Sequence, residues 1–193
     1  MLMDAAELER RLAAATDADT SRGLNFNRLF DLVRERAGPE AARRCDPRGK
    51  GSRFDLFAYP VREYLDAAWA AGELLAPGLG GVDAFWDSLG RRSVTGFLGS
   101  TIGRAIFAVA GRDPRRMLAA APTGYRAAAS YGERTVEWLG EKRARLVVKR
   151  DFLPPAFHRG VILAALEPSN ARDPVVTLRE TGPLDAEYDI AWQ

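Results

Sequence analysis

The order of elements predicted for the last third of the chain constrains the fold most. Residues 134–139 and 143–149 are rich in β-branched and aromatic side chains and meet at the turn pair Gly140-Glu141. An apolar amphipathic run over 157–166 follows a double proline, and two more strand-like runs, 175–180 and 187–192, flank Gly182-Pro183. The pattern predicts a β-β-α-β-β unit.

The preceding part of the chain reads almost wholly as helix. Phe26, Leu29, Phe30 and Val33, for example, form an apolar stripe at spacings of three and four. We therefore predict an α+β fold, with a helical N-terminal layer followed by a β-β-α-β-β antiparallel sheet subdomain. Residues 1–193 are expected to form a single domain, helical over 1–130 and sheet-forming over 131–193.

Several segments are expected to interrupt the helices. Residues 17–23 are polar and typical of a turn, and Gly38-Pro39 ends a helix. Residues 44–53 are basic and glycine-rich, which predicts an exposed, mobile loop, and Pro122 should stop or kink the helix that contains it. Lys50 in the glycine-rich loop does not have the GxxxxGK[ST] spacing of a phosphate-binding loop, so we expect none there.

Composition excludes several classes of protein. The formal net charge is only +2, and the aromatic residues are not interleaved with Lys and Arg, so we expect no nucleic-acid partner. The first residues, MLMDAAELERRLAAAT, lack the apolar stretch of a signal peptide. Because the chain also has no run of about 18 apolar residues, we expect a cytoplasmic protein with no membrane span.

Cysteine and histidine are too few for most metal and nucleophilic sites. Cys45 is the one cysteine and His158 the one histidine of the sequence. An intramolecular disulfide and a Cys₄ zinc site are therefore impossible, and the sequence shows no cluster of transition-metal ligands. Cys45 lies beside arginines that would favour a thiolate, although a bystander thiol is the simpler interpretation. His158 could ligate iron, bind a carboxylate or pack structurally, and packing is favoured. We predict no metal, no cofactor and no enzymatic activity.

Six residues are predicted to line a ligand pocket between the helical layer and the sheet. A sheet covered on one face by its local helix would leave its other face to the N-terminal helices, where large aromatic side chains meet imperfectly. Alternation along the first strand places Val136 and Trp138 on one face. The six candidates are Trp69, Phe97, Tyr125, Trp138, His158 and Tyr188.

Segments 19–38, 59–69, 90–104, 113–140, 150–167 and 184–192 carry a family resemblance. Through them the chain resembles an uncharacterised family of single-domain proteins found mainly in myxobacteria. The passage HRGVILAALEPSNARDPVVTLRE (158–180) and the element order also resemble a wider class of ligand-binding domains. That class includes the heme nitric-oxide/oxygen-binding domain, the four-vinyl-reductase domain and vesicle-tethering TRAPP subunits.

The departures from the wider class bear on heme. The heme sensor carries its iron-ligating His on a helix before the sheet, which here corresponds to 113–129, where no His occurs. Its Tyr-x-Ser-x-Arg signature is replaced by the sequence RDFLP over 150–154, and the cysteines of many four-vinyl-reductase domains are missing. The resemblance therefore implies a ligand-binding fold that does not hold heme in the known manner.

These observations favour a heme-free sensor or binding module with a hydrophobic, lipid-like ligand, such as a fatty acid, in the pocket. Tyr125, His158 and Tyr188 could orient the polar end of that ligand. The alternative is a protein-interaction module with a fully packed core, acting on a protein partner or as a homodimer. An enzyme is a third, more distant interpretation.

Overall fold

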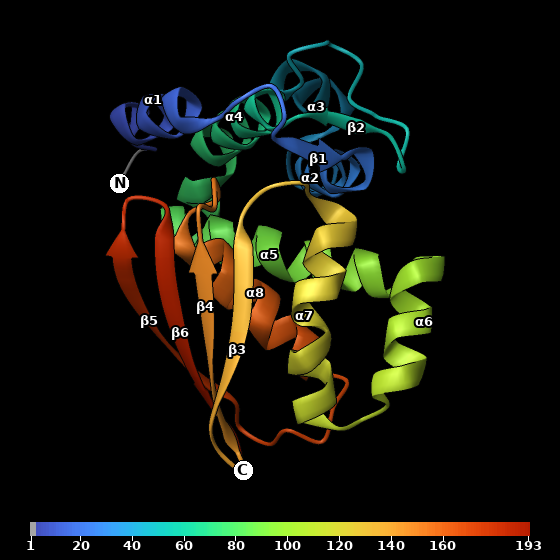
Figure 1. Cartoon of the computed structure of the whole chain (residues 1–193). Coiled ribbons are helices and arrows are strands. Elements are labelled where there is room, and N and C mark those ends of the chain that lie inside the picture. Colours follow the sequence, from blue (N-terminus) through green and yellow to red (C-terminus); the bar gives the residue numbers. More distant parts are fainter. Residues whose placement is uncertain (1–2) are drawn as a thin grey trace.

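The computed structural model describes residues 3–193, apart from the side chains of Ile102 and Ile106, and has the predicted α+β order (Figure 1). The helices are α1 Ala5–Ala14, α2 Gly23–Ala37, α3 Pro39–Cys45, α4 Val61–Leu79, α5 Val82–Leu98, α6 Thr101–Ala110, α7 Pro114–Ala128 and α8 Pro155–Leu166. The strands are β1 Thr20–Arg22, β2 Ala58–Pro60, β3 Glu133–Gly140, β4 Arg143–Lys149, β5 Val175–Gly182 and β6 Asp185–Ala191. The predicted β-β-α-β-β unit corresponds to β3 through β6 and is confirmed.

The main sheet is antiparallel, with strand order β3-β4-β6-β5. Leu146 on the central strand β4 lies opposite Val136 of β3 and Tyr188 of β6, so these side chains share one face. That face is apolar and buried, whereas the opposite face carries charged pairs such as Arg145 and Asp189, whose Nε and Oδ1 are 2.6 Å apart. Alternation along the strands thus produces one covered and one solvent-facing side.

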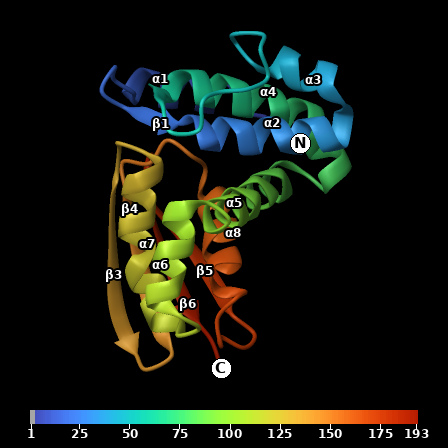
Figure 2. The ribbon, with the colours of Figure 1, turned by 90° about the vertical axis from the view of Figure 1, so that its right-hand side faces the viewer.

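The helices that cover the sheet all lie on this one face. Leu118 of α7 and Ile162 and Leu166 of α8 pack together on the inward side chains of β4 and β6. Figures 1 and 2 show α5, α6, α7 and α8 on the same side of the sheet. The expectation that the N-terminal helices cover the second face is wrong, because the alternating charged residues of β4 and β6 make that face polar.

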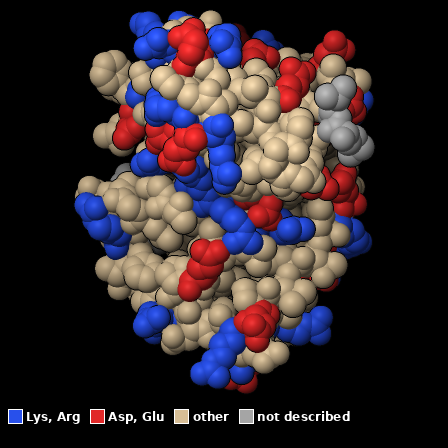
Figure 3. Space-filling model, turned by 180° about the vertical axis from the view of Figure 1, so that it is seen from behind, with Lys and Arg blue, Asp and Glu red and all other residues tan. Residues whose placement is uncertain are grey.

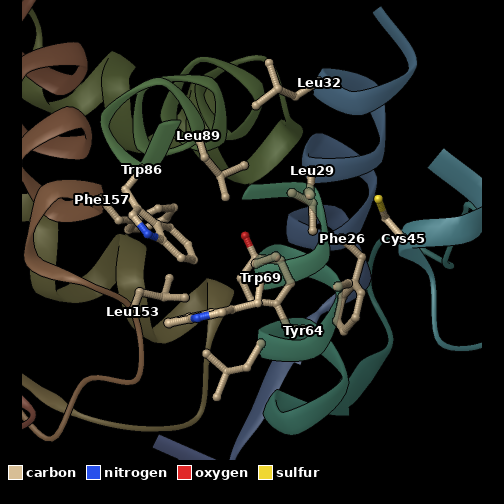
Figure 4. Packing of buried hydrophobic residues seen from close by; sticks show 14 of the residues in the cluster. Phe26, Leu29, Leu32, Cys45, Tyr64, Trp69, Trp86, Leu89, Leu153 and Phe157 are labelled. Atoms are coloured by element: carbon tan, nitrogen blue, oxygen red, sulfur yellow. The ribbon is translucent and has the colours of Figure 1, made fainter. Parts of the chain in front are cut away.

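Helices α1 to α4 form a separate layer above the sheet end (Figure 2). Phe26 and Tyr64 pack edge-on with ring centroids 5.1 Å apart, and Trp69 meets Trp86 of α5 at 5.0 Å (Figure 4). Helix α5 therefore shares its buried face with this layer and continues down to the sheet layer. Helix α5 thus connects the hydrophobic core of the helical layer to the sheet layer.

Glycines set the close approach of α5 and α8. A Cβ on Gly90 would lie 2.0 Å from the carbonyl oxygen of Phe157, and one on Gly160 would lie 2.1 Å from that of Asp87. Only glycine allows the two backbones to approach this closely. The aromatic and apolar residues of α5 are thereby fixed against α8.

Three local predictions were wrong. The turn-like segment before α2 contains β1, which pairs with β2 in a short antiparallel ribbon. Helix α7 does not stop at Pro122, the first of the two alternatives expected there, but continues to Ala128. The loop after α3 is not wholly exposed, because Asp46 is buried and binds Arg53, whose side chain is 2% exposed. Backbone N–H groups of Lys50 and Gly51 also donate to that carboxylate, which explains why a polar loop folds inward.

Charge is distributed without a dominant sign. On the back face, acidic and basic side chains are interspersed among uncharged ones (Figure 3), as the formal net charge of +2 suggests. Within residues 3–193, no single helix is both long and apolar enough to cross a membrane, although α5 and residues 103–110 meet that criterion together as a bent pair, by length and composition only.

Candidate functional site

A cavity of about 140 Å³ lies between α5, α7, α8 and the inner face of the sheet. Its lining is mostly apolar and includes Val94, Phe97, Leu98, Met117, Ala120, Ala121, Gly124, Ala128, Leu146, Phe157, Val161 and Ile162. The small residues explain the space: Ala120, Gly124 and Ala128 recur every four positions and so occupy one face of α7. A Cβ built on Gly124 would meet the Phe97 ring at the ordinary contact distance of 3.6 Å, so the missing side chain leaves space for about one methyl group there.

Three polar residues that line one end of the cavity, Tyr125, Arg134 and His158, surround the buried carboxylate of Asp151, which does not itself line the cavity. Tyr125 Oη donates to Asp151 Oδ2 at 2.8 Å, and the backbone N–H of Leu153 donates to Oδ1 at 2.8 Å. Arg134 forms an ion pair with the same carboxylate, and His158 Nε2 lies 3.1 Å from Oδ1. The side chains of Arg134, Asp151 and His158 are each at most 4% exposed, so the cluster is shielded from water.

The backbone after β4 turns Asp151 into the protein. Arg150 has a φ of 51°, in the left-handed region. Its guanidinium donates two hydrogen bonds, of 2.7 and 2.8 Å, to the Asp19 carboxylate. The N–H of Asp151 then donates to the carbonyl of Leu184 at 2.8 Å. Because Pro155 starts α8 immediately afterwards, His158 enters the cluster from the first turn of that helix.

Burial keeps the imidazole of His158 and the phenols of Tyr125 and Tyr131 in their neutral forms. Desolvation, followed by the positive charges of Arg134 and Arg11, lowers the pKa of His158 well below its usual value of 6.5. Desolvation also raises the pKa of Tyr125 well above 10 and that of Tyr131 to about 12. The imidazole and both phenols are therefore uncharged at neutral pH, and the cluster contains one ion pair, between Arg134 and Asp151.

Three of the six predicted pocket residues meet at the cavity. Phe97, Tyr125 and His158 belong to its wall. Tyr188 lies behind His158, with ring centroids 6.1 Å apart, and its hydroxyl donates to the carbonyl of Pro155 at 3.1 Å. It contributes to a second, much smaller crevice on the far side of His158.

The two remaining tryptophans are elsewhere. Trp69 packs in the core of the helical layer, where its indole N–H donates to the carbonyl of Asp4 at 3.1 Å. Trp138 is 39% exposed and lies under the guanidinium of Arg115, 4.0 Å from the ring centroid. Their placement among the cavity residues was wrong, because Trp69 faces α1 and α5, and Trp138 stands near the far end of β3.

Sequence reasoning missed Arg134 and Asp151, the two charged residues of the site. A carboxylate three residues before the double proline that starts an apolar helix was a usable signal, because a buried helix entry needs its polar groups satisfied. Cys45 is buried in the core of the helical layer, and desolvation raises the pKa of its thiol. In the described part of the chain, no group of three or more His, Cys, Asp or Glu side chains could hold a metal ion.

The fold is that of H-NOX proteins, the heme nitric-oxide/oxygen-binding domains. The structure is similar to the Fe(II) unliganded H-NOX protein from K. algicida, with 16% identity, a TM-score of 0.71, and coverage of 89% of this chain and 96% of that one. It is also similar to the H-NOX protein from S. oneidensis in the Fe(II)NO state, with 11% identity, a TM-score of 0.68, and coverage of 89% and 99%. The H-NOX from Shewanella woodyi bound to IWP-051 gives 16% identity, a TM-score of 0.65, and coverage of 89% and 94%. The expected resemblance is confirmed at the level of fold.

The residues around the cavity do not match what a heme requires. An axial imidazole must direct a ring nitrogen into open space, but Nε2 of His158 faces the Asp151 carboxylate. The Tyr125 hydroxyl donates to the same carboxylate. The cavity of about 140 Å³ is also smaller than the roughly 300–1,000 Å³ that drug-sized ligands occupy, and a porphyrin is at least of that size.

A search of curated protein sequences finds no match to this chain. A family profile, in contrast, matches nearly all of it, from residue 14 to residue 193. The chain therefore belongs to the family described as protein of unknown function (DUF2378).

Proposed function

We propose that this protein is a non-enzymatic, heme-free sensor or binding module that holds a hydrophobic small molecule between α5, α7, α8 and the sheet. The observation that carries the proposal is the apolar cavity of about 140 Å³. Apolar protein cavities of about 150 Å³ stay dry and take up benzene.

The volume restricts the ligand to a single ring or a short chain. A lipid-like molecule or fatty acid would place only one end inside. We further propose that the protein acts in the cytoplasm and senses its ligand without chemical conversion, since Cys45 does not line the cavity and Nε2 of His158 lies against the Asp151 carboxylate.

The ligand-binding proposal predicts that a ring-sized hydrocarbon stabilises the protein. At 100 times its Kd, cyclohexane should add about 2.7 kcal/mol to the free energy of unfolding. For a chain of this length the melting temperature should then rise by roughly 5–11 °C. Gly124→Leu, which places a side chain in the cavity, should abolish the increase. The matched control Ala119→Leu adds the same side chain on the exposed face of α7 and should preserve it. Equal melting temperatures with and without cyclohexane would refute the proposal.

The heme-free part of the proposal has its own test. Purified protein mixed with hemin should retain the spectrum of free hemin. A sharp, saturable Soret band that disappears in His158→Ala would contradict it.

A protein-interaction role is the second candidate, and a different observation favours it. Phe54, Leu56 and Phe57 project from the loop before β2 and are 73%, 74% and 62% exposed. Such an apolar tip suits a contact with a second copy of the chain. If this tip forms a homodimer interface, the double variant Phe54→Ser with Phe57→Ser should be a monomer in sedimentation equilibrium, whereas the wild type should be a dimer. A wild-type protein that sediments as a monomer at all concentrations would exclude the homodimer.

A further inference from the structure

The cavity contains a buried hydrogen-bond donor that the protein leaves unused. Arg134 belongs to the cavity wall and its side chain is 4% exposed. Its Nη1 donates to the carbonyl of Tyr131 at 3.3 Å, and the guanidinium also pairs with Asp151. Its Nε has no hydrogen-bond partner among the residues that the structure describes, and the same holds for Nη2, which pairs with Asp151 by charge, and for Nε2 of His158. A buried N–H without an acceptor is costly, so a ligand that supplies the acceptor gains affinity.

The charges around this donor balance. Asp151 neutralises Arg134, and Arg11, whose Nη1 reaches the Asp151 carbonyl at 3.4 Å, pairs with Glu7 at 2.6 Å. Tyr125 and His158, which also face the carboxylate, are uncharged. An anionic ligand would therefore add a negative charge that no further cation balances, close to the buried Asp151 carboxylate. A neutral oxygen atom adds no charge and still accepts the hydrogen bond.

We infer that the ligand is an uncharged small molecule with an apolar ring or short chain and one acceptor oxygen, such as a ketone or an ester, that accepts a hydrogen bond from Arg134 Nε–H. The inference rests on the proposed function and specifies its ligand class. The apolar residues of α5, α7 and α8 would enclose the carbon skeleton. Arg134 is then the residue that distinguishes an oxygenated ligand from a hydrocarbon of the same shape.

The test compares three probes of one ring size: cyclohexane, cyclohexanone and cyclohexanecarboxylate. Their Kd values are measured by calorimetry for the wild type and for the paired variant Arg134→Met with Asp151→Asn. This pair removes both charges together, and the Asn oxygen can still accept from Leu153 while its amide NH₂ group donates to the Tyr125 hydroxyl. In the paired variant, the affinity for cyclohexanone relative to cyclohexane should fall by about tenfold or more, and cyclohexanecarboxylate should bind the wild type least.

A second readout uses the wild-type protein alone and so does not depend on the variant folding. The ¹⁵N–¹H signal of Arg134 Nε should shift on addition of cyclohexanone and stay in place with cyclohexane. The inference would be overturned, and the proposed function would stand, if the paired variant left the affinity ratio unchanged or if the Nε signal did not shift with cyclohexanone. Tighter binding of cyclohexanecarboxylate than of cyclohexanone to the wild type would have the same consequence. Failure of all three probes to bind would overturn both.

Discussion

Removing the charge of Asp151 should destabilise the protein more than a typical polar substitution. Asp151→Asn keeps the volume and an acceptor for Leu153 N–H, but leaves the Arg134 guanidinium buried without its counter-ion. Breaking one side of a buried ion pair costs about 3–5 kcal/mol. At roughly 2–4 °C per kcal/mol for this chain length, the melting temperature should fall by roughly 6–20 °C.

A double-mutant cycle separates the ion pair from other effects. Arg134→Met alone should be similarly harmful, because it leaves the carboxylate unpaired. Arg134→Met combined with Asp151→Asn should recover most of the loss, since no buried charge remains. The coupling free energy, obtained from urea unfolding of all four proteins, should therefore be at least about 2 kcal/mol. Single losses of less than about 1 kcal/mol that simply add would refute the role assigned to this pair.

Three further predictions concern single residues. The hydrogen bonds from Arg150 lower the pKa of Asp19 from 3.8 to about 2, so the carboxylate stabilises the fold above its unfolded pKa and this contribution is lost as the pH falls through about 2. Allowing for screening at the half-exposed Arg150, Asp19→Asn should remove about 1 kcal/mol at neutral pH and flatten the acid dependence of urea unfolding; an unchanged pH profile would count against the ion pair. His158 is the sole histidine, so its ring proton signals can be followed directly by NMR, and they should not titrate between about pH 5 and 8 because burial depresses the pKa. A midpoint near the ordinary value of 6.5 would show that the ring is solvated. Gly160→Ala should lower the melting temperature by several degrees, because the new methyl group meets the Asp87 carbonyl, whereas Gly78→Ala, which has open space around it, should not.

The sheet was predictable because its periodicity is local. Residues 143–149 alternate between inward and outward side chains along β4, and glycine-containing turns close both hairpins. The order of elements along the chain then fixed the β-β-α-β-β topology. Which face of the sheet the helices cover depends on residues far apart in the sequence. The face that carries the ion pair of Arg145 and Asp189 is polar, so it is not the face that the helices cover.

The cavity could be predicted only in part, because small residues create it. The prediction selected large aromatic residues and so included Trp69 and Trp138, which pack elsewhere. The space is instead left open by the small residues Ala120, Gly124 and Ala128 along α7. The polar end of the cavity joins Tyr125, Arg134, Asp151 and His158 from α7, β3, the loop after β4 and α8. No short motif encodes that meeting; it follows from tertiary packing.

The most direct test of the account is a methyl NMR titration of the protein with cyclohexane. The methyl signals of Met117, Val161 and Ile162, which line the cavity, should shift in a saturable manner with a single Kd. Those of Val33 and Leu65, buried in the helical layer away from the cavity, should stay unchanged. Saturable shifts confined to the first group would support a ligand-binding cavity. No shift up to the solubility limit of cyclohexane, or equal shifts in both groups, would contradict it.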